Sequence, residues 1–187
     1  MRPRDIRDKN EEGGSMIQNI RRVVLCVTFL MVAAFAPTLG SAADFMIEPL
    51  DYDIPAEVAD AAEAGKNLVI MFGQNGCPYC DKMRKRVFPH PKVAAQYNAH
   101  FIMFEVNIKG DLEVVSHDGE ATTEKKYASK MRARATPLFV FYGKDGQDVL
   151  RLTGYQEPAI FMTAGRYVTS EAYKDGTSFL DFVRSGH

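Results

Sequence analysis

Two cysteines three residues apart carry the strongest chemical signal in the sequence. Cys77-Pro78-Tyr79-Cys80 stands shortly after the apolar run 68–72, where a buried strand is expected to give way to a helix. A dithiol with this spacing can alternate between two thiols and a disulfide. The unpaired N–H groups and the positive dipole end of a helix stabilise a thiolate, which is the form that attacks disulfides. The motif therefore predicts thiol–disulfide redox chemistry.

Other roles for these cysteines fit the sequence less well. A disulfide between Cys77 and Cys80 closes a very small loop, so it adds little to stability. A zinc site needs four ligands, and the histidines at 90, 100, 117 and 187 show no paired ligand spacing. We therefore expect no metal and no other cofactor, and we take the Cys77–Cys80 pair itself as the redox-active group.

Residues 1–43 are predicted to be a signal peptide with a polar leader. Arg21-Arg22 precede an apolar core of about 14 residues that contains the third cysteine, and small residues follow at 40–43. Because the core is shorter than the ~20 residues that span a bilayer, an uncleaved membrane anchor is the less favoured alternative. Cleavage after Ala42 and cleavage after Ala43 fit the sequence equally well.

The remaining chain, 44–187, is long enough for one domain with its own core. Whether translation starts at Met1 or Met16 stays open, and the domain is the same in either case. The whole chain has 23 basic and 24 acidic residues, and residues 1–43 contain six and four of them. That leaves 17 basic and 20 acidic residues without a basic stripe, so no nucleic-acid partner is predicted.

The apolar pattern predicts alternating strands and helices around the cysteine motif. Strands are expected at 68–72, 101–108, 138–142 and 149–153, with Asp145-Gly146 as a hairpin turn between the last two. Helices are expected at 56–64, 78–87, 92–98, 123–132 and from 158 onward, with a break near 175–176. This order of elements favours a mixed sheet covered by helices on both faces.

Three motifs make the chain resemble the thioredoxin-fold family over roughly residues 50–185. They are the C-x-x-C at 77–80, Ala135-Thr136-Pro137 before an apolar strand, and the hairpin around 141–154. The second resembles the cis-proline loop of the family and the third its closing hairpin. The resemblance implies an α/β, thioredoxin-like fold with a mixed central sheet flanked by helices on both faces. Within the family, the signal peptide and the sequence around the motif look most like periplasmic SoxW-type thioredoxins.

The resemblance also implies roles for individual residues. Cys77 is the expected nucleophile, exposed at the helix tip with a lowered thiol pKa, and Cys80 is the half-buried thiol that resolves the mixed disulfide. Pro137 is expected to follow a cis bond and to keep Thr136 extended for pairing with a substrate strand. A plain proline at the start of a strand is the alternative. Substrate contact is also expected from the two residues between the cysteines, Pro78 and Tyr79.

The chain departs from the thioredoxin pattern at the site itself. Gly76 stands where thioredoxins have tryptophan, and the chain has no tryptophan, so a more open surface is expected. Met71 replaces the buried acid of the family, and Glu105 stands in place of its lysine partner. Glu105 either accepts the proton of Cys80 or is an ordinary strand glutamate that faces solvent, and the sequence leaves both interpretations open.

Two segments near the motif invite more than one interpretation. The chain is longer than thioredoxin at 109–122, where Asp118-Gly119 predicts an inserted hairpin that shapes substrate access or only decorates the surface. A basic cluster follows the second cysteine: Lys82, Arg84, Lys85 and Arg86. It is either the solvated face of a helix or a source of positive potential that favours the Cys77 thiolate.

The leading hypothesis is a periplasmic thiol–disulfide oxidoreductase that acts as a reductase. Its expected partners are disulfides of periplasmic proteins, in sulfur oxidation or cytochrome c maturation, and a membrane electron donor; a monomer is expected. The alternatives are a disulfide oxidase or isomerase of protein folding, and a non-catalytic binding or chaperone module with the same fold. The motif does not give the direction of electron flow, because that depends on the redox potential relative to the compartment.

Overall fold

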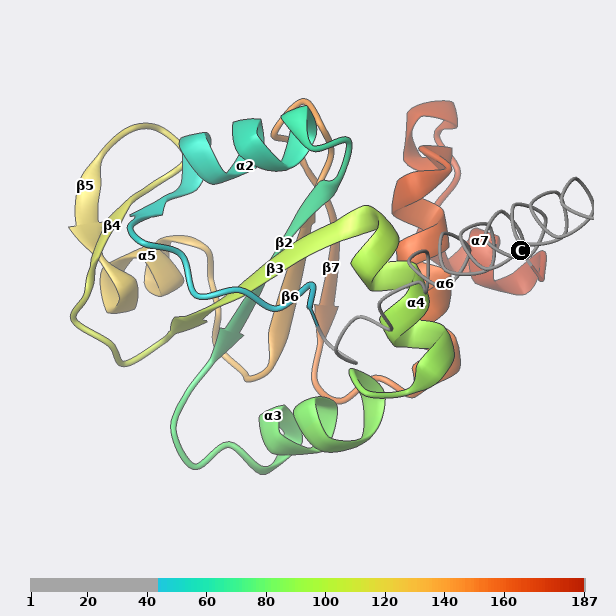
Figure 1. Cartoon of the computed structure of the whole chain (residues 1–187), viewed down its shortest axis with the longest axis horizontal. Helices are drawn as coiled ribbons and strands as arrows, with labels where there is room; N and C mark the ends of the chain where they lie inside the picture. The colour runs from blue at the N-terminus through green and yellow to red at the C-terminus, as the bar shows by residue number, and fades with distance from the viewer. Residues whose placement is uncertain (1–43, 187) are drawn as a thin grey trace, which may run out of the picture. The chain divides into compact units, whose positions relative to one another are not determined.

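The computed structural model describes residues 44–186, so the predicted signal peptide lies outside the described residues (Figure 1). The strands are β1 (Tyr52–Asp53), β2 (Asn67–Gly73), β3 (Phe101–Asn107), β4 (Glu113–Val115), β5 (Ala121–Thr123), β6 (Leu138–Tyr142) and β7 (Asp148–Thr153). The helices are α2 (Ile54–Glu63), α3 (Pro78–Lys82), α4 (Pro91–His100), α5 (Glu124–Lys130), α6 (Pro158–Thr169) and α7 (Phe179–Arg184). A π-helical turn (Met83–Val87) continues α3, and a 3-10 turn (Ala172–Asp175) follows α6.

The strands form a central mixed sheet and a smaller second sheet. The central order is β3-β2-β6-β7, with β2 parallel to β3 and antiparallel to β6, and β7 antiparallel to β6. In the second sheet the order is β1-β4-β5, with β1 parallel to β4 and β4 antiparallel to β5. The predicted mixed sheet is therefore confirmed.

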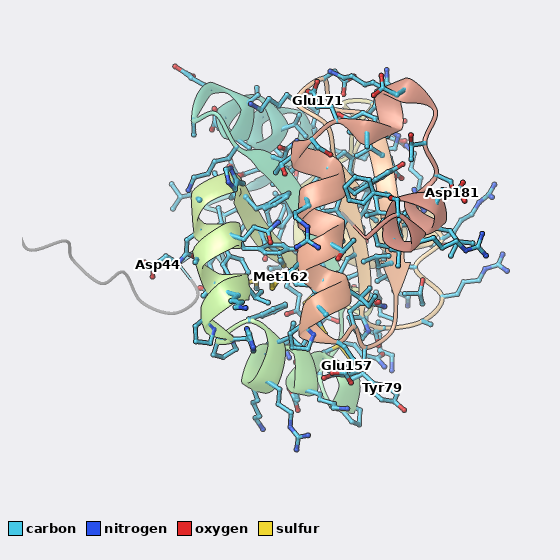
Figure 2. All side chains as sticks on the ribbon, turned by 90° about the vertical axis from the view of Figure 1, so that its right-hand side faces the viewer. Asp44, Tyr79, Glu157, Met162, Glu171 and Asp181 are labelled. Carbon is cyan, nitrogen blue, oxygen red and sulfur yellow. A yellow bond between two sulfur atoms is a disulfide. The ribbon has the colours of Figure 1, made fainter. Side chains whose placement is uncertain are left out.

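Both faces of the central sheet are covered by helices (Figure 1). Strand residues alternate between faces, so Ile70 of β2 packs with α2 and α5, whereas Val69 packs with α3, α4, α6 and α7. On the second face α4 and α6 lie side by side, and Gln96 Nε2 donates to the Met162 carbonyl at 3.1 Å (Figure 2). Every residue of β2 is buried, as its continuous apolar run predicted.

An aromatic core fills the face that carries α4 and α6. The Tyr97 and Phe161 rings stack with centroids 4.4 Å apart, and Phe161 also contacts Phe88, Phe139 and Phe141. The Tyr97 hydroxyl donates to the Phe161 carbonyl at 2.8 Å, and burial raises the pKa of this hydroxyl well above its usual value. Fully burying a phenylalanine side chain contributes about 1.5–3 kcal/mol to stability relative to leaving it exposed. The same apolar cluster includes both cysteines of the motif, so this core supports the redox site from below.

The predicted inserted hairpin is present as β4 and β5. Its turn is fixed by Ser116, whose N–H donates to the Glu120 carbonyl at 2.9 Å and whose hydroxyl donates to Asp118. Lys130 of α5 forms ion pairs with Asp118 and, at 3.2 Å, with Glu120. These contacts fasten the hairpin to the helix that follows it.

Several parts of the fold differ from the sequence prediction, among them β1 and the π-helical turn after α3. Residues 45–47 run beside β3, where the Ile47 N–H donates to the Met103 carbonyl at 2.8 Å; this segment is too short for a periodic signal. The C-terminal helix breaks earlier than predicted, because α6 ends at Thr169 and Glu171 adopts a left-handed φ of 56°. Among residues 44–186, no helix combines the length and the apolar character needed to cross a membrane.

Candidate redox site

The two cysteines of the motif form a disulfide at the start of α3. Cys77 caps the helix: its backbone is extended, and its Sγ accepts a hydrogen bond from the Cys80 N–H at 3.1 Å. Pro78 occupies the first helical position, where its missing N–H costs nothing. Gly76 has a φ of +70°, a left-handed conformation that glycine adopts without strain, and it turns the chain into the helix.

The expected exposure of the cysteines was wrong for this disulfide form. Cys77 is only 3% exposed and Cys80 is fully buried, whereas the sequence suggested an exposed and a half-buried residue. The Cys77 sulfur is bonded to Cys80, receives two hydrogen bonds and rests on the apolar cluster, which together cover it. Tyr79 is 58% exposed, and Figure 2 shows it at the end of the molecule formed by α3.

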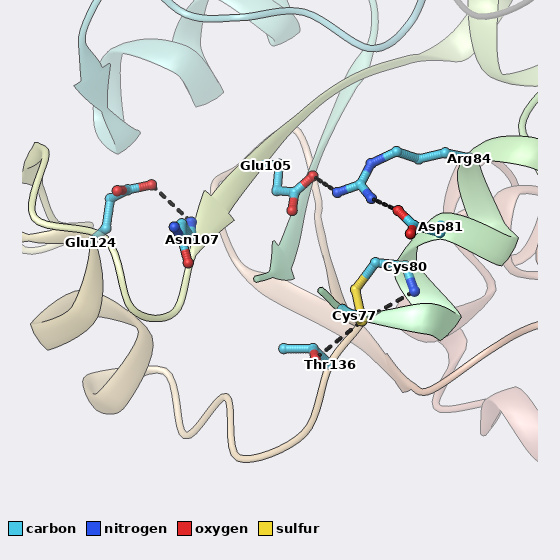
Figure 3. A network of polar contacts seen from close by, with 8 residues as sticks. All are labelled: Cys77, Cys80, Asp81, Arg84, Glu105, Asn107, Glu124 and Thr136. Carbon is cyan, nitrogen blue, oxygen red and sulfur yellow. Dashed lines mark hydrogen bonds and ion pairs between the residues drawn. A yellow bond between two sulfur atoms is a disulfide. The ribbon is translucent and has the colours of Figure 1, made fainter. Parts of the chain in front are cut away.

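The Thr136-Pro137 loop lies beside the disulfide, as the resemblance predicted (Figure 3). The peptide bond between these residues is cis. The Thr136 hydroxyl donates to the Cys77 sulfur at 3.3 Å, so this sulfur has a second hydrogen-bond donor besides the Cys80 N–H. The Pro137 carbonyl accepts from the Gly154 N–H at 2.7 Å, which fixes the loop to the end of β7.

The segment after β7 contacts the helix that carries the cysteines. The Gln156 N–H donates to the Met83 sulfur at 3.4 Å, and the Lys82 ammonium lies 3.7 Å from the centroid of the Tyr155 ring. The second contact is a cation–π interaction, which at exposed sites contributes about 0.5–1 kcal/mol. Met83 is fully buried, as expected for a core methionine. Sequence reasoning missed the Gln156 contact, because it joins residues far apart in the chain.

Glu105 is held in an ion pair with Arg84. Arg84 also donates to Asp81 at 3.0 Å, so one guanidinium joins β3 to the helix of the cysteines (Figure 3). The side chain of Glu105 is 25% exposed, so the carboxylate is partly buried rather than free in solvent. Met71 is its direct neighbour on β2, and a Cβ atom on Gly73 would lie 2.1 Å from Glu105 Oε1. Because Gly73 has no Cβ atom, there is space for the Glu105 carboxylate at this position.

The basic cluster divides into two kinds of residue. Arg84 binds two carboxylates and Lys82 covers an aromatic ring, while Lys85 and Arg86 are exposed as on an ordinary solvated face. Within the described part of the chain, no group of three or more histidine, cysteine or acidic residues is placed to hold a metal ion.

A buried disulfide at a helix start, with two donors on its N-terminal sulfur and a cis-proline loop beside it, defines a thiol–disulfide oxidoreductase. Residues 54–169 match the thioredoxin-like domain family, and the chain belongs to this family. No curated protein matched the sequence.

Solved structures agree with the fold. A thioredoxin-fold protein from Helicobacter pylori is 22% identical over 80% of this chain and 89% of its own, with a TM-score of 0.54. A thioredoxin from Thermus thermophilus is 28% identical, covering 67% of this chain and 91% of its own, with a TM-score of 0.51. A proposed disulphide isomerase from Bacteroides thetaiotaomicron is 22% identical over 68% and 95%, with a TM-score of 0.51. The thioredoxin-like fold is therefore confirmed.

Proposed function

We propose that this oxidoreductase is a periplasmic reductase of protein disulfides, of the SoxW type, that receives its electrons from a membrane donor. The observation that carries the redox part of the proposal is the Cys77 sulfur, which has hydrogen-bond donors from the Cys80 N–H and from the Thr136 hydroxyl; the reductase direction rests on the resemblance to periplasmic thioredoxins. Such donors stabilise a thiolate, so Cys77 is the nucleophile once the disulfide is reduced. The signal peptide that the sequence predicts in residues 1–43 supports the compartment, and sulfur oxidation or cytochrome c maturation is the proposed setting.

The proposed reaction passes two electrons from the protein to a substrate disulfide. The Cys77 thiolate attacks one substrate sulfur, the substrate S–S bond breaks, and the other substrate sulfur leaves as a thiolate. The Cys80 thiol then loses its proton to the Glu105 carboxylate and attacks the Cys77 sulfur. This step breaks the mixed disulfide, releases the second substrate thiol and forms the Cys77–Cys80 disulfide that the structure contains. A dithiol of the membrane donor restores the reduced protein.

Four residues around the disulfide are proposed to hold the substrate. Thr136 lies beside the Cys77 sulfur, where its backbone can pair with an extended substrate segment, and Pro137, whose carbonyl is bound to Gly154, positions it. Pro78 and Tyr79 are exposed between the cysteines, and the Tyr79 ring offers apolar surface to the substrate.

The redox potential of the Cys77–Cys80 pair tests the direction of electron flow. Titration against dithiothreitol or glutathione should give a strongly reducing potential, close to that of thioredoxin, which is about −270 mV. A value near the about −120 mV of a strong oxidant would favour the disulfide oxidase instead. Failure to exchange with either couple would favour a non-catalytic module.

The compartment needs a separate test. Residues 1–43 fused to a reporter enzyme that is active only after export should give activity, and N-terminal sequencing of the exported protein should find cleavage after Ala42 or Ala43. A reporter that stays inactive in the cytoplasm would contradict the periplasmic assignment, without affecting the redox chemistry.

A further inference from the structure

A cleft of about 590 Å³ lies next to the loop that leads into the cysteine motif. It is lined by residues of β1, β3 and α5, by the start of the inserted segment and by Gln74 and Asn75, which precede Cys77 by only a few residues. Gly76 completes this loop, and no heavy atom lies within 4 Å of where its Cβ would be. The loop that leads to Cys77 therefore forms one border of the cleft.

Glu124 is a buried carboxylate in the lining of this cleft. The residue is 3% exposed, and its Oε1 accepts a hydrogen bond from the Asn107 N–H at 2.8 Å. No ion pair to Glu124 occurs among those of residues 44–186. A Cβ on Gly110 would lie 1.8 Å from its Oε2, so the loop makes room for the carboxylate. Burying a charge without a counter-ion is unfavourable, and a cation from outside would compensate it.

The lining contains three carboxylates and one cationic side chain. Arg84, its cationic residue, is already bound to Glu105 and Asp81 (Figure 3). Within the described chain, the buried Oε1 of Gln74 has no hydrogen-bond partner. Asp111 adds an exposed carboxylate. A guest that supplies N–H donors and positive charge therefore fits this cleft better than an anion does.

Two further observations restrict the chemical type of ligand that fits this cleft. Tyr52 also lines the cleft, and burial, followed by the nearby carboxylates of Glu124, Glu48 and Glu105, raises the pKa of its hydroxyl. Leu112, which is 59% exposed, supplies apolar surface in the same lining. An apolar stem that ends in a cationic head matches this combination, and lysine and arginine side chains have that form.

We propose that this cleft binds a lysine or arginine side chain of the disulfide-bearing partner protein, close in sequence to its reactive cysteine. The cationic head donates hydrogen bonds to the carboxylates of Glu124 and Asp111 and to the side-chain oxygen Oε1 of Gln74, and its stem packs on Leu112. The site selects substrates whose cysteine is flanked by a basic residue. The inference rests on the proposed function, since it assigns the substrates of the same redox site.

The test uses two disulfide peptides that differ only in one residue next to the cysteine, which is lysine in one and norleucine in the other. The full mature protein should reduce the lysine peptide with a kcat/KM about tenfold higher, which corresponds to about 1.4 kcal/mol. In the Glu124→Gln variant, the ratio of the kcat/KM for the lysine peptide to that for the norleucine peptide should fall toward one. Glu113→Gln is the matched control, because Glu113 is an exposed acidic residue of β4 that does not line the cleft. This variant should keep the wild-type ratio.

Asp111→Lys provides a second variant if Glu124→Gln fails to fold. It places a cation at an exposed position of the cleft, so the ratio should fall below one. A ratio of one in the wild-type protein, or a ratio that survives both substitutions, would overturn the inference. A preference for the lysine peptide that disappears above about 0.5 M salt would support the inference, because ions screen charge pairs.

Failure of the proposed function gives a different result. If neither peptide is reduced, the double variant Cys77→Ser/Cys80→Ser still reports on the cleft through fluorescence anisotropy of labelled, reduced peptides. Tighter binding of the lysine peptide supports the cleft even without reduction. Equal binding of both peptides rejects it.

Discussion

The two sides of the loop 74–76 are built from different interactions. On the disulfide side, Cys77 is held by a covalent bond, by two hydrogen bonds to its sulfur and by an apolar core that contains no charged group. On the cleft side, the carboxylates of Glu105 and Glu124 lie over Gly73 and Gly110, where a Cβ atom would collide with them. Only the first of these carboxylates has a cationic partner within the described chain.

This difference separates the chemistry of the protein from its choice of substrate. The disulfide side is built from the two sulfur atoms, a helix start, the Thr136 hydroxyl and an apolar core. The cleft side depends on the inserted segment and on Glu124, whose contact with Asn107 spans 17 residues of sequence. We infer that the disulfide side provides reactivity and that the cleft side provides selectivity.

The largest effect is expected from the cysteines themselves. Cys77→Ser should abolish reduction of any disulfide, while Cys80→Ser should accumulate mixed disulfides with substrates, because the resolving thiol is missing. In the reduced wild-type protein, Cys77 should react with iodoacetamide at pH 6–7 faster than Cys80, since two donors stabilise its thiolate. Mass spectrometry after timed quenching measures both rates. Equal rates, or trapping through Cys80, would reverse the assignment of the two roles.

The apolar support of the disulfide side can be weakened at Phe161. Phe161→Ala removes a fully buried ring that contacts four other aromatic residues, so the free energy of unfolding should fall by about 3–5 kcal/mol. Guanidinium denaturation of the mature domain measures this change. Leu180→Ala is the control, because Leu180 is 57% exposed and its removal should change the stability by less than about 0.5 kcal/mol. Similar small losses in both variants would mean that this core does not carry the site.

Glu105 connects the two sides, and its substitution should separate two steps of the reaction. Glu105→Gln keeps the shape of the side chain but cannot take up a proton. Resolution of the mixed disulfide by Cys80 should therefore slow by about 10²-fold, the lower end of the range for general base catalysis, while the attack by Cys77 is unaffected. Stopped-flow measurement of both steps from pH 5 to 9 distinguishes them, with Glu113→Gln as the charge-matched control. Unchanged resolution at every pH would leave water as the proton acceptor.

The sequence predicted the disulfide side well because its signals are local. The C-x-x-C motif, the apolar run of β2 and the Thr136-Pro137 dipeptide each lie within a few residues, and the structure brings them together at one place. The degree of cysteine burial was missed, because it depends on the aromatic core beneath and on Thr136, which is 59 residues from Cys77.

The cleft side could not be predicted to the same extent. Glu105 was singled out from its strand position, but its partner Arg84 looked like one residue of a basic run, and nothing in the sequence tells which member turns toward β3. Glu124 gave no signal at all. Its buried carboxylate needs the space left by Gly110, which is a property of the packed chain rather than of a motif.

The smallest effect concerns the hairpin that forms part of the cleft side. The pKa of the Asp118 carboxyl is lowered because Lys130 and the Ser116 hydroxyl donate to it. A carboxyl with a lowered folded-state pKa adds stability that is fully present above its unfolded value of about 3.9 and is lost as the pH falls through the folded value. Asp118→Asn should therefore be less stable than the wild type at pH 7, and the difference should shrink steadily below about pH 4. Urea denaturation at pH 7, 4 and 3 measures it, with Asp60→Asn on the exposed face of α2 as the comparison. A stability difference that is equal at all three pH values would mean that the Asp118–Lys130 pair does not hold the hairpin in solution.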